Sequence, residues 1–226
     1  DIGVFIFDTD YSINISELAE ETEQRGYESL FVPEHTHIPT SRRSPFPGGG
    51  DLPKQYSHTL DPFVSLGFAA AATKSLKIGT GICLLPQRDP IVTAKSIASL
   101  DLMSNGRFVL GLGGGWNVDE MENHGVTYKT RFSMMKEHVL AMKSLWVDEE
   151  AEFHGEYVDF DKSWAYPKPV QKPYPPILMG GETDYTLKRV VDYCDGWFPR
   201  GRGGFDAGES MQRLKNMADK GNRDMS

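Results

Sequence analysis

The chain has 226 residues, 39% apolar and 11% aromatic, which is enough to bury one large core. Its net charge of −8 is spread over interspersed acids and bases, so nucleic acid is not an expected partner. The sequence has no run of about 20 apolar residues, so a membrane is not an expected partner either. Two cysteines, Cys83 and Cys194, provide no disulfide framework and indicate a reducing compartment such as the cytoplasm.

Six short apolar runs predict β-strands, and helical patterns separate them. The strands are expected at residues 2–7, 29–32, 76–81, 107–110, 177–179 and 196–198. Helices are expected at residues 16–25, 63–73, 90–103, 130–147, 185–193 and 209–220, with a short polar helix within 116–125. Two helices begin with Asp-Pro, at Asp61-Pro62 and Asp89-Pro90, where the aspartate caps the helix and the proline takes its first position.

Two segments interrupt the alternation of strands and helices. Residues 34–60 are rich in proline, glycine, serine and charge, and a loop of this length in a compact domain predicts a lid or a mobile binding loop. Residues 149–176 are interpreted as an insertion. Within it, residues 154–161 suggest a hairpin, and residues 167–176 are too rich in proline for helix or strand.

The alternation predicts a single domain, residues 1–226, built on a parallel sheet that is either closed as a barrel or open. In such sheets, ligands bind at the carboxyl ends of the strands. An eight-unit barrel needs about 250 residues, so two units of roughly 50 residues in total are expected to be missing from the C-terminus. An open six-unit barrel would expose two strand edges. An intact mass equal to the 25.3 kDa of this sequence would contradict the expectation that two units are missing.

Glycines gather after the fourth and fifth predicted strands. The run 111–116 is a weak dinucleotide fingerprint, because Trp116 stands at the last glycine position and the strand is not the first. Its glycines still permit backbone N–H groups to approach an anion. The run 180–183 opens a helix, and is either a phosphate seat or a plain turn capped by Thr183 or Asp184.

Glu34, His35 and His37 follow the second predicted strand, at the edge where ligands bind. An imidazole there can shuttle a proton, although a surface histidine at the root of a long loop is the simpler alternative. His35 and His37 also have the spacing of two metal ligands. The later strand ends supply glycines and apolar residues in place of further ligands, so no metal is expected.

Four segments, residues 79–90, 99–116, 166–181 and 195–199, resemble the bacterial luciferase-like superfamily, in order and over nearly the whole chain. Within it the chain is most similar to the actinobacterial branch of F420-dependent oxidoreductases related to methylenetetrahydromethanopterin reductase. The resemblance implies a (β/α)8 TIM barrel with an insertion after the fourth unit. It also implies a flavin or deazaflavin cofactor, and commonly a homodimer.

By this resemblance, Glu34 and His35 form a catalytic pair beside the reactive face of the cofactor ring. A cis peptide without proline is expected at Gly81–Ile82, in a bulge that includes Cys83 and presses against the ring. Further cofactor contacts, to the polar chain and its phosphate, are expected from Gly113, Gly114, Gly115, Trp116, Gly180, Gly181, Glu182 and Thr183.

The expected reaction is hydride transfer between coenzyme F420 and a small organic substrate held under residues 34–60. The first alternative is an FMN-dependent monooxygenase, and a flavin or F420 reductase is a candidate partner. A flavin-binding barrel without turnover and a metal-dependent hydrolase are further alternatives. The branch that oxidises sugar phosphates has an acid where this chain has Trp116, which argues against that reaction. It leaves Glu120 and Glu122 as candidate proton donors.

Overall fold

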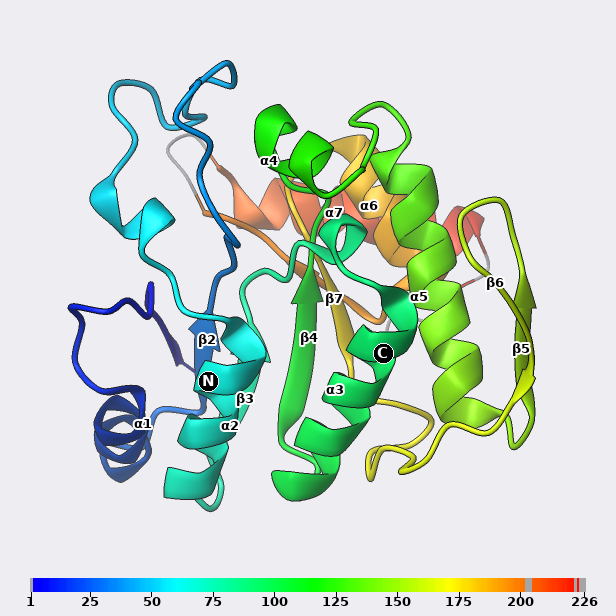
Figure 1. Ribbon diagram of the computed structural model, residues 1–226, viewed down its shortest axis with the longest axis horizontal. Helices are drawn as coiled ribbons and strands as arrows, with labels where there is room; N and C mark the ends of the chain where they lie inside the picture. Colours follow the sequence, from blue (N-terminus) through cyan, green and yellow to red (C-terminus); the bar gives the residue numbers. More distant parts are fainter. Residues whose placement is uncertain (1, 202–204, 222, 224–226) are drawn as a thin grey trace.

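Six parallel strands form one sheet in the computed structural model, in the order β1-β2-β3-β4-β7-β8, and the helices pack against its outer face (Figure 1). The structure describes residues 2–201, 205–221 and 223. The strands are β1 Gly3–Phe5, β2 Ser29–Val32, β3 Lys77–Thr80, β4 Phe108–Leu112, β5 Ala151–His154, β6 Asp159–Ser163, β7 Ile177–Gly180 and β8 Gly196–Phe198. The helices are α1 Ile15–Gln24, α2 Pro62–Ala72, α3 Pro90–Met103, α4 Val118–Asn123, α5 Arg131–Val147, α6 Asp184–Tyr193 and α7 Ala207–Lys220. Two short 3-10 helices are η1 Lys54–Ser57 and η2 Leu85–Gln87.

The sheet is strongly curled. Phe31 lies on β2 and Phe198 on β8, four strand spacings apart, which is about 19 Å in a flat sheet. Their ring centroids are nevertheless only 5.1 Å apart, so the concave face brings the two strands together. Gly79 faces the same side, and a Cβ there would lie 2.4 Å from the Phe31 ring. The sheet is therefore the wall of a partial barrel, as the alternation of strands and helices predicts.

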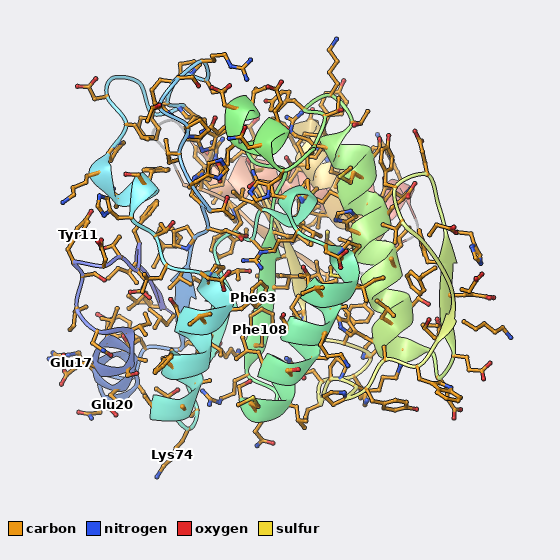
Figure 2. All side chains as sticks on the ribbon, viewed as in Figure 1. Tyr11, Glu17, Glu20, Phe63, Lys74 and Phe108 are labelled. Atoms are coloured by element: carbon orange, nitrogen blue, oxygen red, sulfur yellow. The ribbon has the colours of Figure 1, made fainter. Side chains whose placement is uncertain are left out.

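The main core lies between the convex face of the sheet and the helices. Leu30, Ile78 and Phe108 are register partners on β2, β3 and β4, and all three are fully buried. Figure 2 shows Phe63 of α2 beside Phe108, with ring centroids 6.1 Å apart. Each fully buried side chain of this size stabilises the fold by about 1.5–3 kcal/mol relative to an exposed one.

The helix starts follow the capping chemistry that the sequence predicts. Asp61 accepts hydrogen bonds from the N–H groups of Phe63 and Val64 at the start of α2. Asp89 accepts one from Val92 at the start of α3. The strand boundaries are less accurate: β1 is shorter than the predicted 2–7, and the predicted strand 76–81 gives way to a bulge beyond its carboxyl end.

At the amino ends of the strands, Arg107 joins three segments of the chain. Its guanidinium donates hydrogen bonds of 2.7–3.1 Å to four backbone carbonyls, those of Ala70, Thr73, Leu76 and Ser104. These carbonyls belong to the end of α2, the turn before β3 and the end of α3. All of them lie at the end of the sheet opposite the loops that follow the strands.

The segment predicted as an insertion contains an antiparallel pair, β5 and β6, between α5 and β7. Glu137 of α5 accepts hydrogen bonds from the backbone N–H groups of Glu156, Tyr157 and Val158, and so holds the hairpin turn. Beyond β6 the chain has cis bonds before Pro167 and Pro173. No helix in the described ranges has the length and apolar character required to cross a membrane.

Candidate active site

The loops that follow β2, β3, β4 and β7 meet at the carboxyl ends of the parallel strands, where the candidate residues were expected. The cis peptide bond is present at Gly81–Ile82, as the family resemblance implies. Directly after it, the N–H of Cys83 donates to the Gly111 carbonyl at 2.7 Å and the Cys83 carbonyl accepts from Gly113 at 3.0 Å. The bulge after β3 is thereby continued as an extra bridge to β4.

The Ile82 side chain of this bulge lies against the glycine-bearing ends of β4 and β7. A Cβ on Gly113 would lie 2.5 Å from Ile82 Cδ1, and one on Gly180 would lie 3.0 Å from Ile82 Cγ2. These two glycines therefore leave the space that Ile82 fills. Cys83 is fully buried and its burial raises the pKa of its thiol, so the side chain is a neutral packing group.

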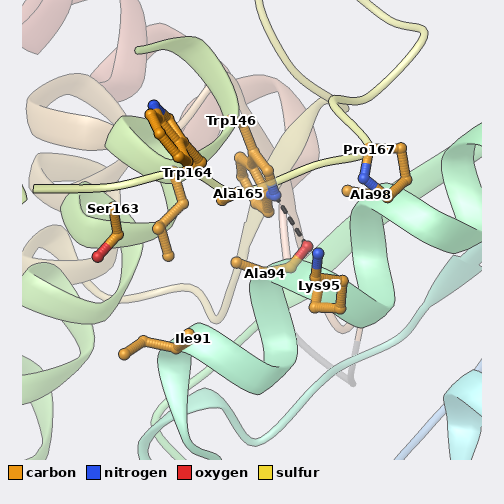
Figure 3. Close-up of a pocket in the computed structure, with 10 residues that line it drawn as sticks. Ile91, Ala94, Lys95, Ala98, Trp146, Ser163, Trp164, Ala165 and Pro167 are labelled. Atoms are coloured by element: carbon orange, nitrogen blue, oxygen red, sulfur yellow. Dashed lines mark hydrogen bonds between the residues drawn. The ribbon is translucent and has the colours of Figure 1, made fainter. Parts of the chain in front are cut away.

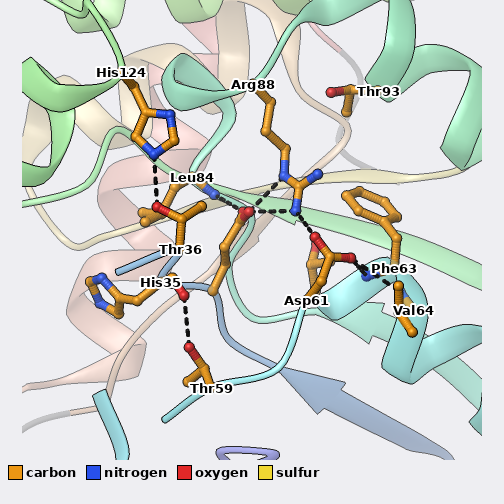
Figure 4. Close-up of polar contacts among 12 residues, drawn as sticks. His35, Thr36, Thr59, Asp61, Phe63, Val64, Leu84, Arg88, Thr93 and His124 are labelled. Atoms are coloured by element: carbon orange, nitrogen blue, oxygen red, sulfur yellow. Dashed lines mark hydrogen bonds and ion pairs between the residues drawn. The ribbon is translucent and has the colours of Figure 1, made fainter. Parts of the chain in front are cut away.

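Glu34 lies beneath the bulge. Its carboxylate, with 2% of the side chain exposed, accepts hydrogen bonds from Leu84 N–H at 2.7 Å and from Arg88 Nε at 2.6 Å. Arg88 also contacts Asp61, the cap of α2, at 2.6 Å (Figure 4). The carboxylate raises the pKa of the Arg88 guanidinium despite its burial. Glu34 thus ties β2 to the loop after β3, and the structure does not bring its carboxylate to the imidazole of His35.

His35 pairs with a different acid, Glu120 of α4. Its Nδ1 lies 2.8 Å from Glu120 Oε2, and the other oxygen of Glu120 accepts from the backbone N–H of Thr36 at 3.2 Å. Glu120 is fully buried and His35 is 8% exposed. An ionised carboxylate only accepts hydrogen bonds, so a neutral imidazole in this contact donates from Nδ1 and leaves Nε2 as its acceptor nitrogen. Within the described residues, Nε2 makes no hydrogen bond.

Aromatic side chains from the long loop and from the segment after β4 surround this histidine. Its ring centroid lies 5.3 Å from Tyr56 and 5.8 Å from Trp116, and Phe46 lies 5.2 Å from Tyr56. Trp116 belongs to this cluster, and its expected contact with the polar chain of a cofactor stays a prediction. The cluster removes the histidine from bulk water on the side of the loop.

The loop of residues 34–60 is docked onto α4. Arg43 pairs with Asp119 at 2.8 Å and with Glu122 at 2.5 Å, and Ser44 accepts from Val118 N–H at 2.9 Å. The hydrogen bond from Ser41, followed by those from Arg43, lowers the pKa of the Asp119 carboxyl. The predicted role of this loop as a mobile lid stays a prediction.

The remaining glycine positions also have neighbours within the chain. A Cβ on Gly114 would lie 2.7 Å from the Phe132 ring, and one on Gly115, whose φ is +70°, would lie 2.6 Å from Met121. Gly181 has φ +121°, a conformation that favours glycine. Close packing therefore explains the glycines in both runs without requiring a ligand.

The predicted phosphate seat at the start of α6 is already engaged by its own residues. Thr183 caps the helix by accepting from Thr186 N–H at 3.2 Å. Glu182 forms an ion pair with Arg200, whose Nε lies 2.9 Å from its carboxylate. The N-terminus of α6 carries a paired carboxylate, and its predicted role as a phosphate seat stays a prediction.

The two-histidine alternative does not assemble a metal site. His35 bonds to Glu120, whereas His37 Nε2 lies 2.8 Å from the Asn123 amide nitrogen. In the part of the chain that the structure describes, no group of three or more histidine, cysteine, aspartate or glutamate side chains is arranged to hold a metal ion.

Three contributors to the site carried little signal in the sequence. Glu120 appeared only as a candidate proton donor, Arg88 was read as part of a loop, and Tyr56 lies in the long loop. Glu120 occupies the first turn of a helix that begins at the carboxyl edge of the sheet, and this position is the available clue.

A separate apolar cavity of about 110 Å³ lies between α3, α5 and the segment after β6, bordered by Trp146 and Trp164 (Figure 3).

A family model described as luciferase-like monooxygenase matches residues 10–226. An uncharacterized protein of Mycobacterium tuberculosis is 42% identical over 226 residues, covering 98% of this chain and 79% of that protein. The F420-dependent hydroxymycolic acid dehydrogenase of the same species is 29% identical over 149 residues, 64% of this chain and 41% of its own. The FMNH2-dependent dimethylsulfone monooxygenase of Pseudomonas putida is 28% identical over 152 residues, 66% of this chain and 40% of its own.

Solved structures share the architecture. The monooxygenase RslO1 from Streptomyces bottropensis superposes with a TM-score of 0.84 at 20% identity, covering 100% of this chain and 68% of that one. An F420-dependent secondary alcohol dehydrogenase, bound to an F420–acetone adduct, gives a TM-score of 0.78 at 23% identity, covering 99% and 65%. At these identities the likeness establishes the fold.

Proposed function

Because the chain belongs to the luciferase-like monooxygenase family, we propose that it is an oxidoreductase that transfers a hydride between coenzyme F420 and a small organic substrate. The observation that carries this proposal is the pair of His35 and Glu120 at the carboxyl ends of the strands. It supplies a nearly buried imidazole whose Nδ1 proton is held by a fully buried carboxylate, so that Nε2 can accept a proton.

The deazaflavin, when bound, accepts or donates the hydride. The proton that accompanies the hydride needs a separate acceptor. When an alcohol is oxidised with the deazaflavin bound as hydride acceptor, Nε2 of His35 would take the O–H proton, and Glu120 would stabilise the positive imidazolium. In the reverse direction the same nitrogen donates the proton. Glu34 has an indirect, positioning role, because its carboxylate holds the bulge of Gly81 and Ile82 in place by accepting a hydrogen bond from Leu84 N–H.

The residues at the strand ends fit a flavin-type cofactor on two observations. The Gly81–Ile82 bulge is a rigid apolar ledge, held by Cys83 hydrogen bonds to β4. Near the glycine loop after β4, the guanidinium of Arg131 has a buried Nε without a hydrogen-bond partner among the described residues, which suits an anionic group. Both F420 and FMN combine a flat ring with a phosphate.

The alternative is an FMN-dependent monooxygenase, in which reduced flavin and oxygen oxidise the substrate. It is favoured by the 28% identity to the dimethylsulfone monooxygenase, almost equal to the 29% identity to the F420-dependent dehydrogenase. A separate flavin reductase would then be the partner that supplies reduced FMN.

Parallel fluorescence titrations of the purified protein with F420 and with FMN test the choice of cofactor. Binding of F420, followed by a change in its absorbance when a panel of alcohols is added, is the expected result. Tight binding of FMN alone would contradict the F420 assignment and favour the monooxygenase.

A variant pair then tests the role of His35. His35→Ala should retain cofactor binding and lose most of the turnover. The matched control is His58→Ala, which removes a half-buried histidine of the same loop that pairs with Asp10. Equal activity in both variants and in the wild type would refute a catalytic role for His35.

A homodimer is part of this proposal. Helix α2 contains no charged residue, yet its Val64 and Phe68 side chains are exposed. Neighbouring α3 exposes Val92 and Met103. An outer helix without charge, as α2 is, is unusual for a surface facing water, and a two-fold axis would cover this face with the same face of a second copy.

A further inference from the structure

Two arginines share one aromatic ring beside the glycine loop that follows β4. Phe132 lies in the first turn of α5, and its ring fills the space next to Gly114, where a Cβ would come within 2.7 Å. The guanidinium carbon of Arg131 lies 4.3 Å from the Phe132 ring centroid, and that of Arg189, from α6, lies 3.7 Å from it. The beginning of α5 and the side of α6 thus each place a guanidinium group against the Phe132 ring.

Neither charge is neutralised within the described ranges of the chain, where Arg131 and Arg189 form no ion pair with a carboxylate. Arg43, Arg88 and Arg200, by contrast, each pair with an acid. The chain has 32 acidic side chains against 24 basic ones, so the lack of a partner is not a shortage of carboxylates.

The hydrogen-bonding capacity of the pair is also largely unused. Arg131 Nη1 donates to the Tyr128 carbonyl at 2.6 Å, and its buried Nε has no partner in the described residues. Burial is the main cause that lowers the pKa of the Arg131 guanidinium, and the charge of Arg189 lowers it further. Two guanidinium groups against one ring, close enough for the charge of Arg189 to act on Arg131 and with an N–H on Arg131 unpaired among the described residues, attract an oxyanion.

We propose that Arg131 and Arg189 form an oxyanion site, and that the phosphoryl- or carboxylate-bearing side chain of the cofactor is its ligand. This rests on the proposed function. It places the anion at the seam of α5 and α6, and not at the start of α6, where Thr183 caps the helix and Glu182 already pairs with Arg200. Guanidinium groups bind phosphoryl and carboxylate oxygens with paired, charge-assisted hydrogen bonds.

The test compares cofactors that differ only in the anionic side chain. Wild-type protein and the Arg131→Met/Arg189→Met double variant are titrated with F420 and with its chromophore lacking the phosphate and glutamates, and likewise with FMN and riboflavin. The wild type should bind the anionic form about tenfold or more tightly than the neutral one, and in the double variant this ratio should fall towards one. The affinity for the neutral chromophore should stay unchanged.

Two controls separate a lost site from a lost fold. Arg25→Met removes an exposed arginine of α1 that pairs with Glu21, and it should leave the ratio intact. The Arg131→Lys/Arg189→Lys variant keeps the charges and should retain part of the discrimination. A ratio that survives in the methionine double variant, with native circular dichroism, would overturn the proposal.

Inorganic pyrophosphate separates the anion site from the cofactor assignment. It should raise the melting temperature of the wild type and not that of the methionine double variant. If pyrophosphate acts in this way while neither F420 nor FMN binds, the proposed function fails and the oxyanion site stands, with a free phosphate as its ligand. If F420 or FMN binds the wild type no better than its neutral chromophore does, the site is refuted while the function stands.

Discussion

The carboxylate of Glu120 lies 2.8 Å from Nδ1 of His35, although 85 positions separate the two residues in the chain. One carboxylate thereby selects the tautomer of the imidazole and, through Thr36 N–H, fixes the backbone that carries it. The acid that works with His35 is therefore on α4, and Glu34 serves the neighbouring loop.

Glu120→Gln should lower kcat by about 10–100-fold with little change in KM, because the amide no longer holds one tautomer of His35. Steady-state kinetics measure the split between kcat and KM, and nitrogen chemical shifts of the His35 ring report the tautomer. Glu122→Gln on the exposed side of α4 is the matched control. If Glu120→Gln changed the tautomer of His35 but kept the wild-type kcat, the hydrogen bond between Glu120 and His35 would not contribute to catalysis, and the prediction would be wrong.

Gly113→Ala should lower the free energy of unfolding by about 1–3 kcal/mol, because its Cβ would overlap Ile82 Cδ1. Ile82→Ala in the same chain should relieve the overlap, giving a coupling of about 0.5–3 kcal/mol in a double-mutant cycle. Urea denaturation provides the four free energies. Simple additivity of the two changes would contradict the packing of Ile82 over Gly113.

Arg88→Met should lower the free energy of unfolding by about 3–5 kcal/mol, because it leaves the buried carboxylate of Glu34 without its charged partner. Arg25→Met breaks an exposed pair and should cost at most about 1 kcal/mol. Chemical denaturation of both variants gives the comparison, and equal losses would refute the buried role of Arg88.

Glu23 predicts a stability change at acid pH. Hydrogen bonds from the Ser75 backbone N–H first, then from Leu76 and Lys74, lower its pKa from the ordinary 4.5 to about 2. Because the pKa of Glu23 is lower in the folded state, its ionised carboxylate stabilises the folded protein at pH values above the pKa of the unfolded state. This contribution disappears as the pH falls from about 4.5 to about 2. The melting temperature of the wild type should thus be higher than that of Glu23→Gln at pH 7. The difference between the two melting temperatures should shrink as the pH falls from about 4.5 to about 2. A difference independent of pH would contradict the assignment.

Phe68→Asp should convert the proposed homodimer to a monomer, because it introduces a charge into the apolar face of α2. Tyr185→Asp is the control, since Tyr185 is comparably exposed but lies on α6. Size-exclusion chromatography with light scattering measures the mass. A wild type that is monomeric at micromolar concentration would refute the dimer.

Local chemistry made much of the fold predictable from the sequence. The cap-and-proline starts at Asp61 and Asp89 identified two helices correctly, and the apolar runs identified all six parallel strands. These features depend on a few neighbouring residues. The cis bond at Gly81–Ile82 came from family resemblance, because a glycine at a strand end has no such meaning by itself.

Long-range partners were beyond sequence reasoning. Glu34 and Glu120 both lie at the carboxyl edge of the sheet, and which of them meets His35 depends on how α4 and the loop after β3 pack. The predicted cofactor contacts of Gly113 and Gly180 stay predictions, and the structure adds a packing requirement that the sequence did not reveal, the bulk of Ile82 against both glycines. Each of these relationships joins segments that only the curled sheet brings together.

The hydrogen bonds of Arg107 at the amino ends of the strands have an evolutionary consequence. Apart from one to the Thr73 hydroxyl, the bonds from its guanidinium end on backbone carbonyls, which every amino acid supplies, so the positions of Ala70, Leu76 and Ser104 can drift in identity without losing this connection. At the other end, contacts such as that of His35 with Glu120 require particular side chains. A directed-evolution library is therefore best aimed at the loops after the strands, because the opposite end preserves the scaffold while substrate preference is varied.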